Sequence, residues 1–169
     1  MSISMHSASV PIFVKTLGNV LAWLDRAQAH AQAKKFDPSV LLSTRLAPDM
    51  LPFTQQIQIA CDTAKFGVAR LAGVDSPKFE DNEASFDELR ERIRKTLDFL
   101  QSVPASKIDG TEGKDVTVPL RDRSITLKGE FYLKHFALPN FFFHVTTAYA
   151  LVRHNGVELG KRDFLGSLQ

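Results

Sequence analysis

Four segments of the chain repeat apolar side chains every three or four residues, and this rhythm constrains the fold more than any other feature. Residues at that spacing share one face of a helix, so each segment is expected to form a helix that buries one apolar stripe. The first segment runs from about Ser9 to Lys35. Its stripe consists of Val10, Val14, Leu17, Leu21 and Leu24.

The second and third helices are bounded by residues that start or stop helices. The second is expected from about Leu51 to Leu71, with Gly73 as its stop. The third begins at Ser85, whose hydroxyl can cap a helix while Glu88 completes a capping box. Pro104 prevents its continuation. These segments therefore contribute two further amphipathic helices.

The last helix is expected from about Glu130 to His154 and is rich in aromatic side chains. Pro139 removes one backbone hydrogen bond from it, which predicts a kink or a break near Ala137. The three phenylalanines at positions 141–143 cover most of the helix circumference, so part of this run faces either another helix or a second subunit. A homodimer is one expected outcome of this aromatic surface.

Two short segments between the third and fourth helices, 116–120 and 124–127, alternate apolar and polar residues as strands do. Pro119 cannot donate to a strand ladder, so the pair is expected to form an exposed hairpin that decorates the helices. The sequence therefore predicts an all-α four-helix bundle with a small β-hairpin inserted between helices three and four. A chain of 169 residues fits a single domain, residues 1–169.

The charges of the chain are nearly balanced. The sequence has 21 Lys and Arg against 19 Asp and Glu, and the formal net charge of +2 is too small to recruit nucleic acid. Basic residues also stand among acidic neighbours, as in Glu-Leu-Arg-Glu-Arg at positions 88–92, which indicates a solvated helix face. No nucleic-acid partner is expected.

Cys61 is the only cysteine, so no internal disulfide can form and a reducing compartment is the simplest location. We expect Cys61 to fill the core. The first nine residues lack the cationic start and apolar run of a secretory signal. No apolar stretch approaches the roughly 18 residues of a membrane span. We therefore expect a cytoplasmic protein with no membrane partner.

The best candidate polar cluster lies on the last helix. Asn140, His144 and Thr147 share one face because they are four and three residues apart. Gln58 and Asp62, four apart on helix two, are expected to contribute from across the core. These five residues form a candidate pocket for an unknown small molecule. The alternative is a structural polar network or a contact between subunits, because buried polar groups pair whether or not they do chemistry.

The two histidines of the last helix are poorly placed for one metal ion. His135 and His144 are nine residues apart, which puts them half a turn out of phase on a straight helix. One buried, hydrogen-bonded histidine and one surface histidine are therefore expected. Amide and hydroxyl oxygens are poor zinc ligands, so no metal is expected. If one binds, the set is His144, Asp62 and a reoriented His135.

The segment 135–149, HFALPNFFFHVTTAY, and its continuation RHNGVELGK at 153–161 resemble an uncharacterised bacterial family, domain of unknown function 1993. Matches at 2–5, at Val10-Pro11 and at 45–50 extend the resemblance over nearly the whole chain. This family is similar to the DinB and YfiT-like metalloenzyme superfamily. The resemblance implies a four-helix bundle that is frequently a dimer.

The same resemblance implies a metal site of three histidines. One comes from helix two, and two come from a His-x-x-x-His pair shortly before a Leu-Arg-x-x-Gly ending. When residues 152–156 are placed on that ending, His144 takes the position of the second histidine and Asn140 that of the first. The helix-two position falls near Gln58. Two of the three ligands are thus missing.

We therefore expect a metal-free, DinB-like homodimer that binds an unknown small molecule or acts in a stress response. The alternative is a metal-dependent enzyme that uses zinc or nickel, such as a thiol-cofactor transferase, with His144 as a surviving ligand. A purely structural oligomer is the third hypothesis. The sequence identifies no catalytic residue.

Overall fold

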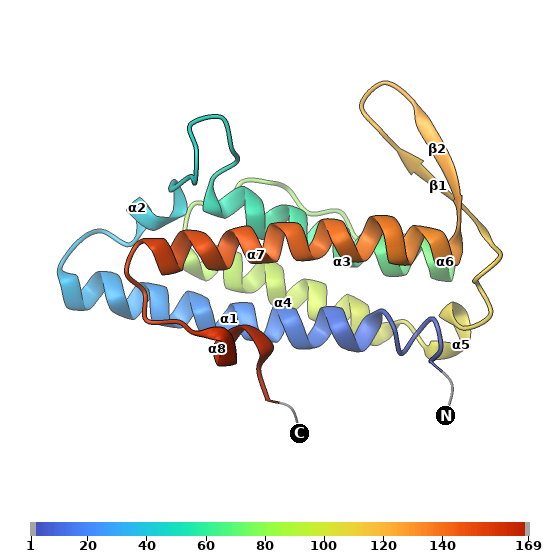
Figure 1. The fold of residues 1–169 in the computed structure, drawn as a ribbon, viewed down its shortest axis with the longest axis horizontal. Helices are drawn as coiled ribbons and strands as arrows, with labels where there is room; N and C mark the ends of the chain where they lie inside the picture. Colours follow the sequence, from blue (N-terminus) through green and yellow to red (C-terminus); the bar gives the residue numbers. More distant parts are fainter. Residues whose placement is uncertain (1–2, 168–169) are drawn as a thin grey trace.

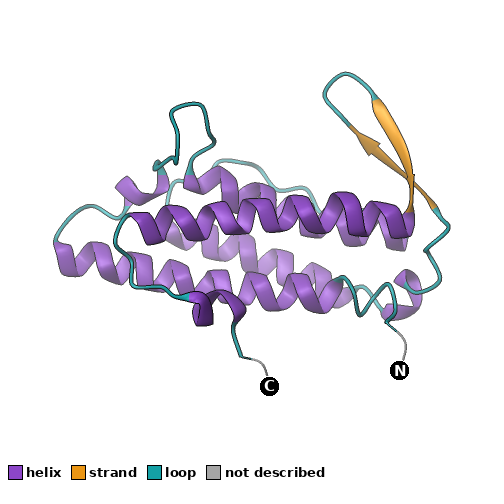
Figure 2. Cartoon of the chain, in the orientation of Figure 1, coloured by secondary structure: helices purple, strands orange, loops and turns teal. Residues whose placement is uncertain are grey.

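Helices account for most of the structure, a computed structural model that describes residues 3–167 (Figures 1 and 2). The four longest are α1, α3, α4 and α7, and they lie close to the boundaries predicted from the apolar rhythm. The elements are α1 Val10–Lys34, α2 Ser39–Leu42, α3 Phe53–Ala72, α4 Phe86–Ser102, α5 Ala105–Ile108, β1 Asp115–Pro119, β2 Ser124–Lys128, α6 Gly129–Tyr132, the π-helical turn η1 Leu133–Ala137, α7 Leu138–His154 and α8 Lys161–Leu165.

The four long helices run side by side and share one apolar core (Figure 1). Helix α3 packs against α7 on one side and α4 on another, while α1 packs along α4. The predicted stripe of α1 supplies Leu17 and Leu24, which are both fully buried. Phe13 meets Phe141 of α7 edge-on, with ring centroids 4.8 Å apart. The position of α3 therefore gives this helix partners on more than one face.

Helix ends follow the expected signals. Gly73 ends α3 in the left-handed region, at φ 67°. The Ser85 hydroxyl accepts the Glu88 N–H at 3.2 Å, and the Glu88 carboxylate accepts the Ala84 N–H at 2.7 Å. The first bond satisfies a backbone donor of the first turn of α4, and the second binds the residue that precedes the cap. The capping residues therefore fix where α4 begins.

The predicted break before Pro139 takes the form of a π-helical turn. Pro139 has no N–H to donate to the carbonyl four residues earlier, which is that of His135. Residues 133–137 absorb this defect by widening to π geometry, and α6, η1 and α7 continue as one rod (Figure 1). The helix is therefore irregular but uninterrupted.

The predicted hairpin is present as the antiparallel pair β1–β2, which projects from one end of the helices (Figure 2). Val116 and Val118 are buried while Thr117 between them is exposed, so one face of β1 packs inward. Gly129 follows β2 directly, and a Cβ at this position would collide with the carbonyl oxygen of Thr111. Glycine is therefore required where the hairpin rejoins the helices.

The C-terminal segment docks on α1 through its apolar residues. The Trp23 indole stacks on Phe164 with ring centroids 5.6 Å apart, and its Nε1–H donates to the carbonyl of Asp163 at 3.1 Å. Val157 and Leu159 are buried. The segment thus covers the middle of α1.

The charged run at 88–92 differs from its prediction as a solvated face. Arg90 and Arg92 are buried, at 8% and 3% exposure. Because α4 lies between α1 and α3, the Arg90 side chain reaches Asp25 of α1 at 2.8 Å while Arg92 reaches Asp62 of α3 at 2.9 Å. Alternating charges look the same in sequence whether a helix faces water or two acidic neighbours.

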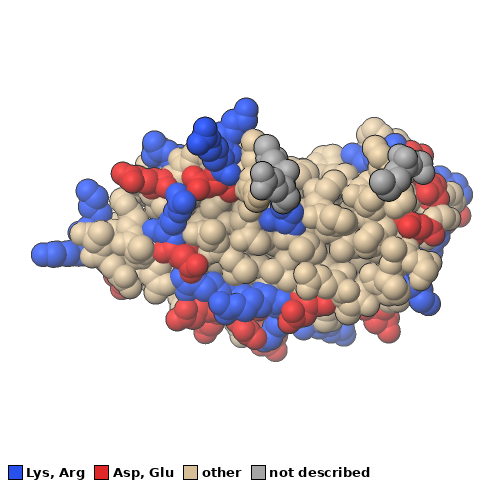
Figure 3. All heavy atoms as spheres, turned by 90° about the horizontal axis from the view of Figure 1, so that it is seen from below, with Lys and Arg blue, Asp and Glu red and all other residues tan. Residues whose placement is uncertain are grey.

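The surface charges are mixed on the face shown in Figure 3. Lys and Arg stand among Asp and Glu, and uncharged residues form a broad area between them. Within residues 3–167, none of the helices has the length and apolar character that crossing a membrane would require.

We expect Leu24→Ala to lower the free energy of unfolding by about 2–5 kcal/mol, because it deletes a fully buried side chain and leaves a cavity. Leu46 is 45% exposed, so the same substitution there should change this free energy by less than about 0.5 kcal/mol. Urea denaturation followed by Trp23 fluorescence measures both. Similar losses in the two variants would contradict the burial of Leu24.

Candidate functional site

Helix α3 carries two polar faces that point in different directions. Gln56 and Thr63 are seven residues apart, so they share the face that meets α7. Gln58, Asp62 and Lys65 are four and three apart and share the face toward α4. That second face is covered by residues 74–85, which we call the strap. Each face belongs to a separate polar cluster.

The α7-side cluster consists of Gln56, Thr63, Asn140 and His144. Gln56 donates from Nε2 to the carbonyl of Leu51 at 3.0 Å, which orients its amide. Its Oε1 then lies 2.7 Å from Nδ1 of His144. An amide oxygen only accepts, so Nδ1 of His144 carries the proton and Nε2 carries the lone pair. The neighbouring side chain therefore selects the tautomer of His144.

The same cluster leaves acceptor atoms without a protein donor. Among the described residues, none bonds Nε2 of His144, and this atom is not sealed from solvent. Asn140 donates from Nδ2 to the Thr63 hydroxyl at 2.8 Å, which leaves its Oδ1 available. Thr147 instead donates to the carbonyl of Phe143 at 2.7 Å, within its own helix. The cluster thus presents an imidazole nitrogen and an amide oxygen as acceptors.

His144 is a neutral base under ordinary conditions. Only 8% of the residue is exposed, and this burial lowers the pKa of its imidazole below the ordinary value of 6.5. At neutral pH the ring is therefore uncharged, and Nε2 can accept a hydrogen bond or a proton.

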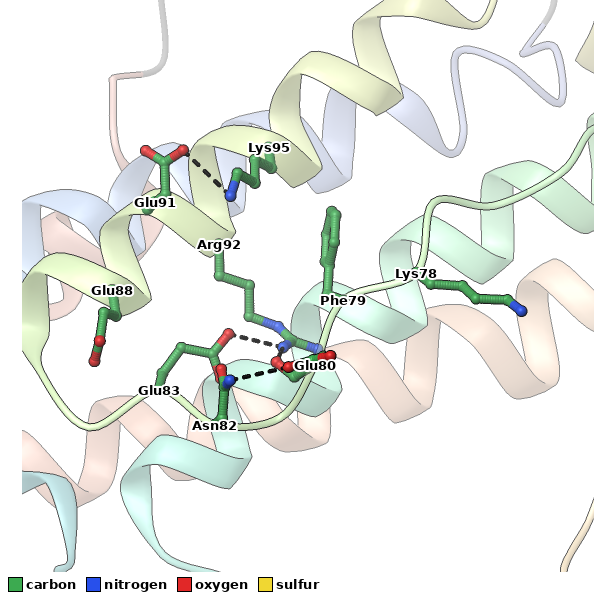
Figure 4. A pocket seen from close by; sticks show the side chains of 9 residues that line it. All are labelled: Lys78, Phe79, Glu80, Asn82, Glu83, Glu88, Glu91, Arg92 and Lys95. Atoms are coloured by element: carbon green, nitrogen blue, oxygen red, sulfur yellow. Dashed lines mark hydrogen bonds and ion pairs between the residues drawn. The ribbon is translucent and has the colours of Figure 1, made fainter.

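The strap-side cluster consists of Gln58, Asp62, Lys65, Glu83 and Arg92. Figure 4 shows Glu83 and Arg92 of this cluster. Arg92 binds the Asp62 carboxylate at 2.9 Å, the strap carboxylate of Asp81 at 2.9 Å and that of Glu83 at 2.8 Å. Gln58 donates to the other oxygen of Glu83 at 2.7 Å. The guanidinium thus joins α4 to α3 and to the strap.

Phe79 of the strap lies beside the two buried cations of this cluster. Nζ of Lys65 is 4.0 Å from the Phe79 ring centroid, and the guanidinium carbon of Arg92 is 5.5 Å from it. Lys65 also pairs with Asp62 at 3.0 Å, and its side chain is only 2% exposed. The ring faces attract both cations, and the attraction strengthens where water is excluded.

Arg92 is the least satisfied member of the cluster. Its Nε is the one buried side-chain nitrogen or oxygen within residues 3–167 that has no hydrogen-bond partner. An unpaired buried donor costs about 1–3 kcal/mol. Burial alone would raise the pKa of Glu83, but hydrogen bonds from Arg92 and Gln58 outweigh it and hold that pKa below its ordinary value. Glu83 is therefore ionised at neutral pH.

Two cavities flank the strap at Asn82 and Glu83. One, of about 280 Å³, lies between the strap and α4 and is lined by Phe79, Arg92 and Lys95 among others (Figure 4). The other, of about 470 Å³, lies between the strap and α2–α3 and is lined by Gln58. Asn82 and Glu83 line both. This part of the strap therefore separates the two cavities.

The structure does not bring the five residues of the predicted pocket together. Asn140 and His144 face α3 as expected, but Gln58 and Asp62 lie on the other polar face of α3, against Glu83 and Arg92. Two residues along a helix change direction by about 200°, so Gln56, and not Gln58, meets His144.

Five residues of these clusters were not among the predicted site residues: Gln56, Thr63, Lys65, Glu83 and Arg92. The seven-residue spacing of Gln56 and Thr63 was a usable signal, because it puts both side chains on one face of their helix, as the four-residue spacing does for Asn140 and His144. Glu83 lies in a segment without periodicity, which offered no such signal.

The expected division between the two histidines is confirmed. His135 is exposed and lies against Phe131, with ring centroids 4.5 Å apart, while His144 is buried and hydrogen-bonded. The fallback metal set of His144, Asp62 and His135 is therefore not brought together, because Asp62 is held by Lys65 and Arg92 on the far side of α3.

The α7-side cluster does not fit a metal site of three histidines. It offers one imidazole, while Gln56 and Asn140 contribute amides, which are weak ligands for zinc. Within residues 3–167, no three side chains of His, Cys, Asp or Glu are grouped as metal ligands. Cys61 offers no thiolate either, because burial raises its pKa to about 12.

The chain is similar to a known protein family and to a solved structure. The model of the family described as domain of unknown function (DUF1993) matches residues 5–165. The chain is also similar to a DinB family member protein from Shewanella denitrificans, with 40% sequence identity and a TM-score of 0.88 to its crystal structure. That similarity covers 96% of this chain and 92% of the other. No curated protein matches the chain.

We expect the free energy of unfolding to fall as the pH drops below about 6.5, partly because of His144. The pKa of His144 is lowered in the folded state, so the unfolded chain takes up a proton at a higher pH than the folded chain does. Acid therefore stabilises the unfolded state relative to the folded state. His144→Gln should flatten this pH dependence in urea unfolding between about pH 5.5 and 7.5.

Ring signals in NMR give an independent readout of the same group. We expect a titration midpoint below 6.5 and nitrogen shifts of the tautomer protonated at Nδ1. A midpoint above 6.5, or protonation at Nε2, would contradict the described environment of His144.

Proposed function

The chain belongs to the domain of unknown function family DUF1993, and from this membership we propose that it is a metal-free DinB-like protein that binds a small molecule. We propose further that residues 1–169 form one four-helix bundle domain. The single apolar core shared by α1, α3, α4 and α7 supports that architecture. The similarity to a DinB family member over 96% of the chain supports it as well.

One observation carries the binding proposal: the hydrogen-bond chain from Leu51 through Gln56 to His144. It fixes a neutral imidazole with Nε2 as a reachable acceptor. Asn140 lies one turn away and offers its Oδ1 on the same face. A ligand that donates hydrogen bonds, such as an amine, an amide or a phenol, matches this pair of acceptors.

The alternative function is a metal-dependent enzyme, for example a thiol-cofactor transferase with zinc or nickel. A histidine whose Nδ1–H is held by a neighbouring acceptor does resemble the usual state of metal-bound histidines. The other two positions of the superfamily site argue against it, because amides stand there, Asn140 on α7 and Gln58 on α3. We therefore favour binding without a resident metal.

The location and the assembly state are part of the proposal. A cytoplasmic location is supported by the lone, buried Cys61, which is protected from oxidation. A homodimer is supported by exposed aromatic side chains on α6 and α7. Phe141 is fully buried and Phe142 packs against the core, but Phe143 is 57% exposed and Phe131 is 52% exposed. A purely structural oligomer would use the same surface without any ligand.

We expect a fragment set of amines, amides and phenols to contain binders that shift the NMR signals of the His144 ring and the Asn140 side-chain amide. His144→Phe should remove this binding because it deletes the acceptor, and His135→Phe should retain it because His135 is exposed elsewhere.

Elemental analysis of protein purified without chelator tests the metal alternative. About one equivalent of zinc or nickel, lost in His144→Ala and retained in His135→Ala, would replace the proposal by the metalloenzyme. A fragment set without binders at His144 would leave only the structural oligomer.

We expect the wild-type protein to sediment as a dimer and Phe143→Glu to sediment as a monomer, because a charge cannot be buried unpaired in an aromatic interface. Gln32→Glu adds the same charge on an exposed position of α1 and should leave the dimer intact. Analytical ultracentrifugation measures both. A dimer unaffected by Phe143→Glu would place the interface elsewhere.

A further inference from the structure

Away from its two end residues, the strap is attached to the helices through side-chain interactions. Between residues 75 and 84, within the described part of the chain, its backbone forms no hydrogen bond with another backbone group. Arg92 makes most of the attachment: it binds the Asp81 and Glu83 carboxylates at 2.9 and 2.8 Å and the Glu80 carbonyl at 3.2 Å. A single guanidinium therefore holds three residues of the strap.

Glu83 occupies a place that is built for a carboxylate. One of its oxygens accepts from Arg92 and the other from Gln58 at 2.7 Å, and its side chain is only 8% exposed. Arg92 and Gln58 come from two different long helices, so their spacing is set by the core and not by the strap. Arg92 and Gln58 would thus stay in place if the strap moved.

The charges beneath the strap require an anion. The helices contribute two buried cations, Arg92 and Lys65, and one anion, Asp62, which leaves one uncompensated positive charge. In the described state the strap supplies its own carboxylates. These carboxylates belong to Asp81 and Glu83. Burying an unpaired cation is costly, so lifting the strap, which removes both carboxylates, demands another anion in their place.

Glu83 leaves one hydrogen-bond donor of Arg92 unpaired. Nε of Arg92 is buried and unpaired while the two terminal nitrogens carry all of the bonds. A free carboxylate has no backbone to restrict its approach and could bind the guanidinium through two parallel bonds, including one to Nε. The cavities of about 280 and 470 Å³ on either side of Glu83 provide room for the rest of such a molecule.

We propose that Arg92 and Gln58 form a binding site for a small organic carboxylate, that Glu83 occupies this site in the absence of ligand, and that the strap is its displaceable cover. The ligand exchanges with Glu83 without covalent chemistry, and the strap lifts as its main anchor is released. This site lies on the opposite polar face of α3 from His144. The proposal for this site is therefore independent of the function proposed for His144.

The test uses the full chain with Glu83→Ala, and with Glu80→Ala as the matched control. Both substitutions remove one strap carboxylate, but the Glu80 side chain does not bind Arg92. Propionate is the probe, and acetamide and chloride at equal ionic strength are the neutral and ionic controls. An NMR titration that follows the Nε–H signal of the Arg92 side chain gives the concentration of propionate that produces half of the maximal shift.

We expect propionate to shift this signal saturably in Glu83→Ala, with half-saturation at least about tenfold lower than in the wild type and in Glu80→Ala, because the internal competitor is gone. Gln58→Leu in the Glu83→Ala background should weaken this response, and His144→Ala should leave it unchanged. A shift no larger than that given by chloride or acetamide would overturn the site.

Movement of the strap is read by trypsin cleavage after Lys78, an exposed strap residue. In the wild type, propionate at about 100 times the half-saturating concentration for Glu83→Ala should speed this cleavage several-fold. Unchanged cleavage would overturn the displaceable cover and assign Glu83 a fixed structural role. If Glu83→Ala does not fold, Glu83→Gln serves instead, because its amide cannot neutralise Arg92. Its half-saturation should then fall below that of the wild type, and equality would overturn the proposal.

Discussion

A helix that is buried on several sides must find a partner for every polar side chain it carries, and α3 is such a helix. Gln56, Gln58, Thr63 and Lys65 are all at most 9% exposed. Each of these polar groups would cost free energy if it lost its partner, so α7, α4 and the strap are each tied to α3 by specific bonds. The positions of both polar clusters follow from this one requirement.

The helices could be predicted because their boundaries depend on local physics. A 3.6-residue apolar rhythm, a capping serine at Ser85, the stop at Gly73 and the irregularity before Pro139 act within a few residues of chain. The burial of Arg90 and Arg92 could not be predicted in this way. It depends on α4 lying between α1 and α3, and no local pattern records which neighbours a helix will have.

The candidate site was predictable in part for the same reason. Asn140 and His144 share a face through their spacing on one helix, and the structure places them together. The choice of Gln58 as their partner was wrong because it required the rotation of α3 relative to α7. That rotation is set by the whole core, and Gln56 and Gln58 differ by about 200° around the helix. The strap, which has no periodicity, gave no sign that Glu83 would reach Arg92.

The two polar clusters differ in the kind of change that each can undergo. The α7-side cluster joins two long helices, whose backbones are held by their own hydrogen bonds, so its geometry is fixed. Its His144 is neutral because burial lowers the pKa of the imidazole. The strap-side cluster joins the helices to a segment that forms no backbone–backbone hydrogen bond between residues 75 and 84, so local opening there breaks only bonds that involve side chains. A buried ion-pair network contributes little net stability compared with apolar packing, and this one also leaves Nε of Arg92 unpaired. Exchange of one anion for another on this side of α3 would therefore leave the helix backbones in place, whereas an equivalent change at α7 would require two packed helices to separate.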